Sequence, residues 1–315
     1  MKPNAIATTL NDSEQNHVQK WLIRLFVILV GFTVAFISAS AFGQETKLQT
    51  ETIKTKDNIK LRTFYFPSNK GKEAIPVLIV HEWKGQASPY AKLVLALNKA
   101  GCAVIVPDYR GHGGSKEYMN RKGETKKFNI DTMNKNDIGS VVTQDLEAVK
   151  RFLVKENNEG KLNLNALVVI GIGEGCILGS NWAMRDWQFG PVGSKKRGQD
   201  VKALVYVSPK KVYKGVSMDP PLKNPAILSL PTFIIWGSES DEAADARQMS
   251  KRITAYKKRA AGSKTAEGIQ SGTIRTSLSG PSLVNESKSV IPEITKFIQA
   301  HIDISDEENP WVKRE

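Results

Sequence analysis

Histidine and cysteine are scarce in this chain, whose 315 residues include four histidines and two cysteines. The histidines are scattered, and no spacing of cysteine and histidine is that of a metal site. Cys102 and Cys176 each lie in an apolar run, which favours two buried thiols over a disulfide. The sequence therefore predicts no metal, no cofactor and no disulfide framework.

Acidic residues are also in deficit, since 32 Asp and Glu face 45 Lys and Arg, for a formal net charge of +13 at pH 7. Such a surplus favours acidic partners, such as an anionic cell-envelope polymer or the face of an anionic membrane, or else serves only solubility. The basic segments 122–127 and 195–197 are the candidate contacts for a polymer. No aromatic-interleaved basic motif is present, so no specific nucleic-acid partner is expected.

One long apolar run, residues 22–42, stands near the start of the chain behind Lys20 and is interrupted by Arg24. Small residues follow it, which is the layout of a secretory signal peptide over residues 1–43. An uncleaved membrane anchor is the alternative, because the uncharged part of the run is near the shortest length that spans a bilayer. Both interpretations predict an exported protein, either periplasmic or secreted, or anchored to the membrane by residues 22–42.

Short apolar runs then alternate with amphipathic segments. Strands are predicted at residues 48–53, 59–66, 75–80, 103–106, 167–170, 203–207, 232–236 and 273–278. Helices are predicted at residues 91–100, 137–155, 177–185, 245–258 and 290–301. This order predicts an α/β fold, a mostly parallel twisted sheet with helices on both faces. The domain is expected to span residues 44–304, with a surface insertion or small cap at 209–230 and a charged, frayed tail at 305–315.

Four short segments with distinctive residues follow one another along the chain. They are His81-Glu82-Trp83, then Asp108-Tyr109-Arg110-Gly111-His112-Gly113-Gly114-Ser115, then Gly171-Ile172-Gly173-Glu174-Gly175, and finally residues 231–241. Together they resemble the α/β-hydrolase superfamily, and the His-Glu-Trp triplet looks most like its dienelactone-hydrolase branch. The resemblance covers roughly residues 48 to 302 and implies the α/β-hydrolase fold.

The third segment resembles the nucleophile elbow, a sharp turn between a strand and a helix. Gly171 and Gly175 fit the positions where small residues let the strand and helix pass closely. Gly173 stands where the resemblance implies a catalytic serine or cysteine. Glycine tolerates the strained backbone of the elbow, but it has no oxygen or sulfur to attack a substrate.

The other two members of the implied triad are also in doubt. Ser240 stands where the family pattern places the acid, and Asp241 follows one residue late, so a one-residue slip would restore a carboxylate. The histidine is expected in the loop at residues 280–285, near Ser282, but that loop contains none. His301 lies beyond it, near the end of the last helix. The triad is therefore interpreted as degenerate.

Several residues near the expected site remain. The resemblance places His81, Glu82 and Trp83 in the oxyanion loop and implies that the backbone N–H of Glu174 is an oxyanion donor. Cys176 is expected to point into the packing between helix and sheet.

Whether the chain is an enzyme is left open. The leading interpretation is a non-catalytic protein, a pseudoenzyme of the cell envelope that binds a small ligand or a partner in the cleft. The alternative is an ester-type hydrolase in which His81 and Glu82 activate water. A third is a binder of acidic polymer that acts through its charge.

Overall fold

The computed structural model describes residues 47–193, 195–262 and 265–314. The leader predicted over residues 1–43 lies outside the described residues. Within the described ranges, no helix combines the length and apolar character needed to cross a membrane.

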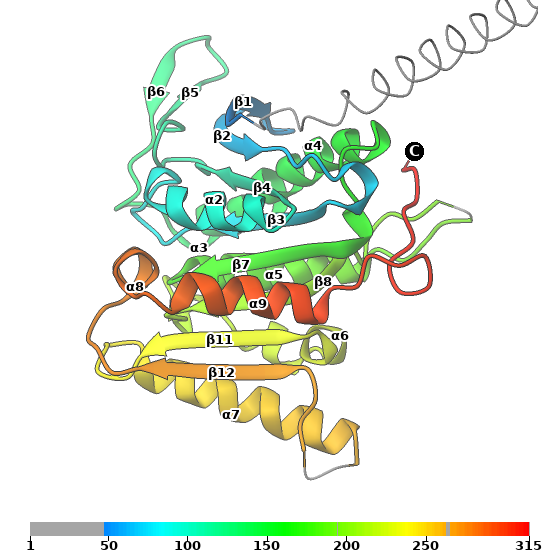
Figure 1. Ribbon diagram of the computed structural model, residues 1–315. Coiled ribbons are helices and arrows are strands. Elements are labelled where there is room, and N and C mark those ends of the chain that lie inside the picture. The colour runs from blue at the N-terminus through cyan, green and yellow to red at the C-terminus, as the bar shows by residue number, and fades with distance from the viewer. Residues whose placement is uncertain (1–46, 194, 263–264, 315) are drawn as a thin grey trace, which may run out of the picture. The chain divides into compact units, whose positions relative to one another are not determined.

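An eight-stranded sheet organises the described chain (Figure 1). Its spatial order is β1-β2-β4-β3-β7-β8-β11-β12. Only the first two pairings, β1 with β2 and β2 with β4, are antiparallel, and the remaining five are parallel. The strands are β1 (Gln49–Lys54), β2 (Lys60–Phe66), β3 (Ile75–Val80), β4 (Cys102–Pro107), β7 (Leu167–Ile172), β8 (Val201–Val207), β11 (Thr232–Gly237) and β12 (Ile269–Ile274). The predicted fold class is confirmed.

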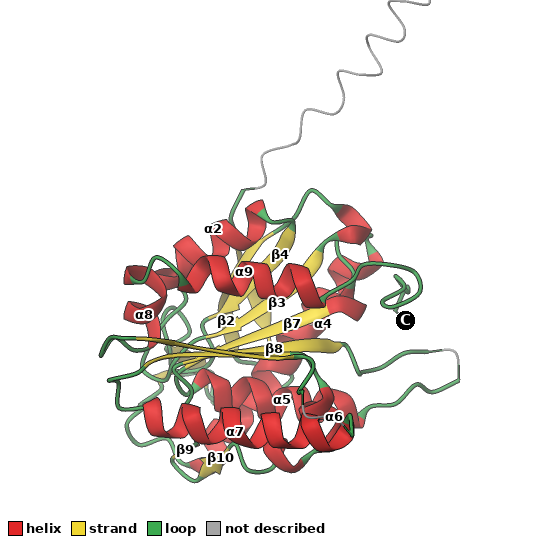
Figure 2. Cartoon of the chain, turned by 60° about the horizontal axis from the view of Figure 1, so that its bottom comes forward, coloured by secondary structure: helices red, strands yellow, loops and turns green. Residues whose placement is uncertain are grey.

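Helices cover both faces of this sheet (Figure 2). One face carries α2 (Ala91–Lys99), α8 (Gly280–Glu286) and α9 (Val290–His301), and the other carries α4 (Leu146–Asn158), α5 (Gly175–Gln188), α6 (Pro225–Ser229) and α7 (Ala243–Ala260). Side chains alternate across each strand, so Val77 and Ile79 pack under one layer while Leu78 and Val80 pack under the other. Strands buried on both faces explain why the sequence shows continuous apolar runs.

The predicted helix at residues 137–155 is divided in the structure. It consists of α3 (Lys135–Ser140), a wide π-helical turn (Val141–Asp145) and α4. Apolar residues still recur at helical spacing through the π-helical turn. The sequence pattern therefore does not reveal that this turn holds one residue more than an α-helical turn. The turn carries the buried carboxylate of Asp145, which holds Arg110 from the loop after β4.

Two other expectations need correction, and one further element is present. The supposed loop at residues 280–285 is the helix α8, which begins with Pro281 in its first turn. The last strand, β12, begins at Ile269 and ends at Ile274, several residues before the predicted position. The polar stretch after β4 contains a small hairpin, β5 (Glu117–Met119) with β6 (Thr125–Lys127), which projects from the body in Figure 1.

The charged tail, expected to fray, packs against the body. Trp311 donates its indole N–H to the carbonyl of Leu162 at 3.1 Å. Arg314 is buried, and its guanidinium binds the carboxylate of Asp200 and the side-chain oxygen of Asn165. These contacts join the end of the chain to residues 162–165 before β7 and to Asp200 before β8, so the described part of the tail packs as part of the domain.

Candidate functional site

The turn between β7 and α5 is a tightly packed elbow. A Cβ on Gly171 would lie 2.5 Å from the Cα of Cys176, and one on Gly175 would lie 2.0 Å from the carbonyl oxygen of Val80. Both distances are far below any real contact, so only glycine fits at these two positions. Gly173, between them, has a φ of +56°, in the left-handed region. The strand-to-helix turn predicted from the sequence is present, with its strained residue at 173.

Glu82, in the loop after β3, occupies the space beside Gly173. A Cβ built on Gly173 would lie 3.1 Å from the Cβ of Glu82, which is closer than ordinary contact. The Glu82 carboxylate accepts a short hydrogen bond from the hydroxyl of Tyr90. Burial raises the pKa of Glu82, although the Tyr90 hydrogen bond opposes the rise. A nucleophile side chain at 173 would therefore have to displace a side chain that is already anchored.

The backbone N–H of Trp83 is already occupied by a side chain of the same site. It donates to the Glu174 carboxylate, with 3.2 Å between nitrogen and oxygen. The other carboxylate oxygen of Glu174 accepts from the ammonium of Lys210 at 2.8 Å. In this kind of elbow the oxyanion hole is formed by a donor from the loop after β3 and by the N–H of the residue after the nucleophile. Here the loop donor is satisfied internally.

A second carboxylate lies on the far side of Lys210. The Lys210 ammonium is 3.9 Å from an oxygen of Glu242, and the Ser279 hydroxyl donates to the other oxygen of Glu242 at 2.8 Å. Asp241, the carboxylate that the sequence offered as a displaced acid, is exposed. The carboxylate that faces the site thus comes from Glu242. Ser279, just before α8, contacts this carboxylate, and residues 280–285 contain no histidine.

His81 is buried beneath this loop, out of reach of solvent. Its Nδ1 donates to the carbonyl of Glu82 at 2.7 Å, and its Nε2 is buried without a hydrogen-bond partner. The ring stacks on Tyr109 with centroids 4.2 Å apart. Burial lowers the pKa of His81 to about 4, while the hydrogen bond to Glu82 opposes the fall. At neutral pH the imidazole is uncharged and supports the loop from inside.

His112 and Trp83 complete this aromatic packing. The Trp83 ring meets the His112 ring edge to face, with centroids 4.5 Å apart. His112 donates from Nδ1 to the carbonyl of Arg110 at 2.9 Å, and burial lowers its pKa to about 4. Both histidines of the described loops are therefore part of the scaffold of the site.

Arg110 and Asp108, from the Asp-x-Arg-Gly-His-Gly segment, tie the loop after β4 to the sheet. The guanidinium of Arg110 binds Asp145 at 2.6 Å and Asp57 at 2.8 Å. Asp108 is fully buried and binds Arg62 at 2.5 Å. These ion pairs give the segment a structural role rather than a catalytic one.

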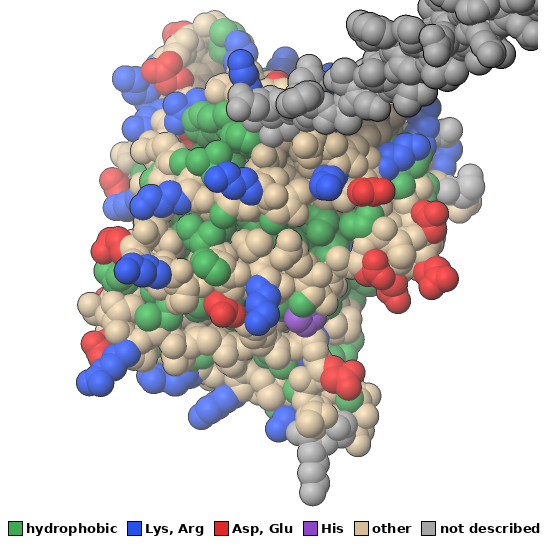
Figure 3. Space-filling model, viewed as in Figure 1, with side chains coloured by type: hydrophobic (Ala, Val, Ile, Leu, Met, Phe, Trp, Pro, Cys, Tyr) green, Lys and Arg blue, Asp and Glu red, His purple; other side chains and the backbone are tan. Residues whose placement is uncertain are grey.

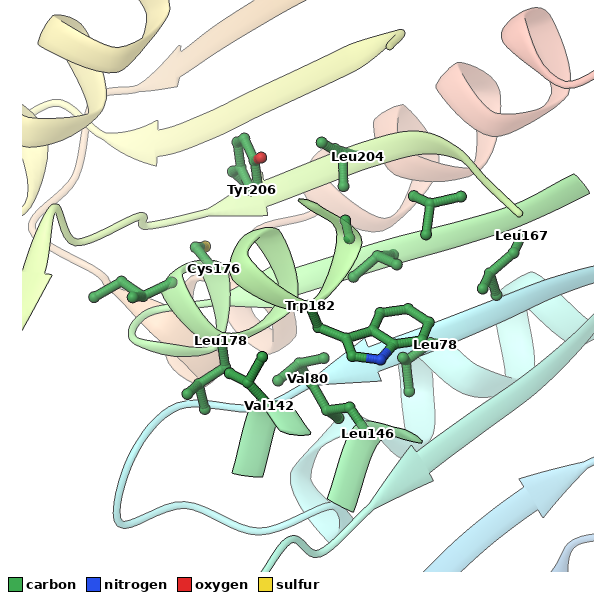
Figure 4. Packing of buried hydrophobic residues seen from close by; sticks show 14 of the residues in the cluster. Leu78, Val80, Val142, Leu146, Leu167, Cys176, Leu178, Trp182, Leu204 and Tyr206 are labelled. Carbon is green, nitrogen blue, oxygen red and sulfur yellow. The ribbon is translucent and has the colours of Figure 1, made fainter. Parts of the chain in front are cut away.

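Cys176 is fully buried in α5, and its thiol lies 3.7 Å from the carbonyl of Val207. Figure 4 shows it in the apolar cluster beside Tyr206. Burial raises the pKa of the thiol well above its ordinary value. Cys102 is also buried, and both cysteines are free, as predicted. Among the described residues, no group of three or more His, Cys, Asp or Glu side chains could hold a metal ion.

Comparisons with known proteins identify the fold of the chain but match it to no family model. No family model matches the sequence. The chain is 36% identical over 63 residues to an uncharacterized protein of Mycobacterium tuberculosis, present in two strains. That match covers 20% of this chain, which spans 22% of the length of these curated relatives.

Solved structures of hydrolases resemble the chain over most of its length. A dienelactone hydrolase from Anabaena variabilis has a TM-score of 0.56 at 14% identity, covering 82% of this chain and 100% of that chain. An esterase from Pyrococcus furiosus has a TM-score of 0.54 at 16% identity, covering 82% and 92%. A carboxyl esterase from Bacillus coagulans has a TM-score of 0.55 at 11% identity, covering 81% and 99%. The chain has the α/β-hydrolase fold.

Within this α/β-hydrolase fold, four residues of the site escaped the sequence analysis. Tyr90, Lys210, Glu242 and Ser279 lie on turns between predicted elements, and only their contacts reveal their importance. Lys210 had one indirect signal, because it lies in the segment 209–230 that the sequence predicts to be a surface insertion or a small cap. That insertion also brings the ring of Tyr213 within 5.7 Å of Trp83.

Proposed function

We propose that this chain is a non-catalytic α/β-hydrolase-fold protein of the cell envelope that binds a ligand or partner at the elbow. The observation that carries the proposal is the pairing of Trp83 with Glu174 beside a glycine elbow. Covalent ester hydrolysis in this fold requires a nucleophile, a base to take its proton and free oxyanion donors. Gly173 supplies no nucleophile, and the loop donor is already engaged.

The polar groups around the elbow satisfy one another. Glu174 is paired with Lys210, Lys210 also approaches Glu242, and Glu242 accepts from Ser279. His81 is inaccessible as a base, since its side chain is fully buried. Because these groups are already paired, a ligand that binds here has to replace their hydrogen bonds with its own.

The proposed location is the cell envelope, and it rests on the leader predicted over residues 1–43. The proposed anionic polymer partner rests on the basic charge of the chain. Of its two candidate segments, 195–197 is partly structural, because Lys196 binds Asn165 at 2.5 Å. The segment 122–127 lies on the projecting β5–β6 hairpin and is the better candidate contact.

A second candidate function is ester hydrolysis by water that Glu82 activates. Its support is the raised pKa of Glu82 at the elbow, together with the esterases among the structural neighbours. A carboxylate with a raised pKa is a better general base near neutral pH than an ordinary one. His81 contributes to this alternative only by holding the backbone of Glu82.

Turnover of short acyl esters separates the two functions, and covalent labelling with a fluorophosphonate, followed by intact mass, tests for a nucleophilic side chain. We expect no adduct on the native chain, and none on Gly173→Ser, because no histidine is placed to take the serine proton. Heat-denatured chain serves as the control for nonspecific labelling. An adduct on the native chain would show a nucleophile that the proposal denies, and an adduct on Gly173→Ser would show that a base has been overlooked.

A further inference from the structure

A second feature, away from the elbow, is an apolar groove between the edge of the sheet and α2. Its volume is about 260 Å³. The side chains that line it include Leu48, Phe64, Phe66, Val94, Leu95 and Val106, and none of the lining residues is charged. Figure 3 shows hydrophobic side chains gathered on this face of the molecule, with lysine or arginine side chains nearby.

The groove leaves large apolar side chains open to solvent. Leu48 is 51% exposed and Leu95 is 47% exposed, although a single exposed leucine would need no explanation. Here the two border the same apolar concavity. An exposed apolar groove with a polar surround is typical of a binding site.

The shape and size of the groove limit its occupant. Ligand pockets are usually roughly 300–1,000 Å³, so this one suits a slender ligand rather than a bulky one. A bilayer is bound through protruding apolar side chains, whereas this feature is concave. A second copy of the chain would need a far larger interface than one small groove provides.

The charge beside the groove favours an anionic head group. Lys47 and Lys92 are exposed and adjoin the lining residues Leu48 and Ala91 in sequence. The lining itself offers a single hydroxyl, from Ser88. We propose that the groove binds one acyl chain of a free fatty acid, with its carboxylate toward the lysines.

This groove is distinct from the elbow, although one short turn borders both. In the turn Ser88–Tyr90, Ser88 lines the groove, whereas the Tyr90 hydroxyl donates to Glu82 at the elbow. The proposal therefore does not depend on the function of the elbow.

The test is a fluorescence titration of the full chain with dansyl-labelled undecanoic acid below its micelle concentration. Ala91→Phe fills the groove from an exposed helix position, and Leu95→Lys removes part of its lining. Val212→Lys is the matched control, because Val212 is 54% exposed, similar to Leu95, and does not line the groove. Every variant keeps the leader, so binding by the leader cancels in the comparison.

We expect saturable binding that each groove variant weakens on the order of tenfold, since part of the buried chain loses its contacts. Val212→Lys should bind like the native chain, and decanoate should displace the probe better than decanol does. Equal binding by all four proteins overturns the proposal, as does binding that requires added vesicles. Equal displacement by decanol and decanoate contradicts the anionic head group. Loss of self-association in Leu95→Lys without any probe binding would assign the groove to a second copy instead.

Discussion

The backbone N–H of Trp83 donates to the carboxylate of Glu174, a residue 91 positions later in the chain, at 3.2 Å. This hydrogen bond joins the loop after β3 to the first residue beyond Gly173. Lys210 holds the opposite oxygen of the same carboxylate. The three residues close the elbow with an internal anion, at the place where hydrolases of this fold stabilise the oxyanion of the substrate.

Replacing Gly173 by alanine should destabilise the protein more than a left-handed backbone alone explains. Left-handed φ costs an alanine roughly 1–2 kcal/mol, and the new methyl would also press on the Cβ of Glu82 at 3.1 Å. Gly123→Ala is the matched control, because Gly123 has a φ of +80° and no atom within 4 Å of its added Cβ. Urea unfolding should show an additional loss on the order of 1 kcal/mol for Gly173→Ala. Equal losses would mean that Glu82 moves aside freely.

Removing the Lys210 ammonium should leave Glu174 with one fewer partner. Lys210→Met should lower the free energy of unfolding by about 1 kcal/mol, a modest value because the lysine is partly exposed and its charge is screened. The neighbouring Lys211→Met removes an ammonium that donates a long hydrogen bond to Gln248, at 3.4 Å, and should change little. If both variants unfold at the same urea concentration, Lys210 does not stabilise the closed elbow.

Acid should destabilise the fold through its two buried histidines. Burial holds the pKa values of His81 and His112 at about 4, below their ordinary 6.5. As the pH falls, the histidines of the unfolded chain therefore bind protons at a higher pH than those of the folded chain do. The stability due to the neutral rings is present above pH 6.5 and is lost as the pH falls toward 4. Each ring should contribute a slope of up to about 1.4 kcal/mol per pH unit in that window.

The measurement is urea unfolding across that pH range for the native chain and for His81→Phe. We expect a shallower pH dependence in the variant, with the remaining histidine slope removed by adding His112→Phe. An unchanged slope in the double variant would show that carboxylates alone determine the acid sensitivity.

The end of the chain should stabilise the domain strongly. Arg314→Met removes a buried guanidinium from Asp200 and Asn165, and we expect a loss of roughly 2–4 kcal/mol, partly offset because Lys150 still pairs with Asp200 at 3.0 Å. Lys313→Met changes an exposed neighbour and should be neutral. Thermal unfolding of the two variants decides the matter, and equal midpoints would restore the picture of a frayed tail.

The sheet could be predicted from the sequence because its strands are buried on both faces. Runs such as residues 75–80 carry that burial directly in their composition. The elbow could also be predicted, because Gly171 and Gly175 mark in the sequence a turn that no larger side chain fits. Both features depend on local patterns.

The polar side of the site could not be predicted in the same way. Glu242 and Ser279 approach each other across 37 positions, and Lys210 reaches Glu174 across 36. Such pairs depend on which loops the folded sheet brings side by side. The spacing of residues within one segment carries no information about that. The helix α8 was missed because Ser279, Gly280 and Pro281 look like a turn, although proline is well suited to the first turn of a helix.

Ester turnover by the purified chain decides whether the elbow is catalytic. We expect the folded protein to hydrolyse p-nitrophenyl acetate no faster than the heat-denatured chain does, and His81→Ala and Glu82→Gln to leave this background unchanged. Turnover above the background that disappears in Glu82→Gln would contradict this prediction and establish a hydrolase that needs no nucleophile at position 173.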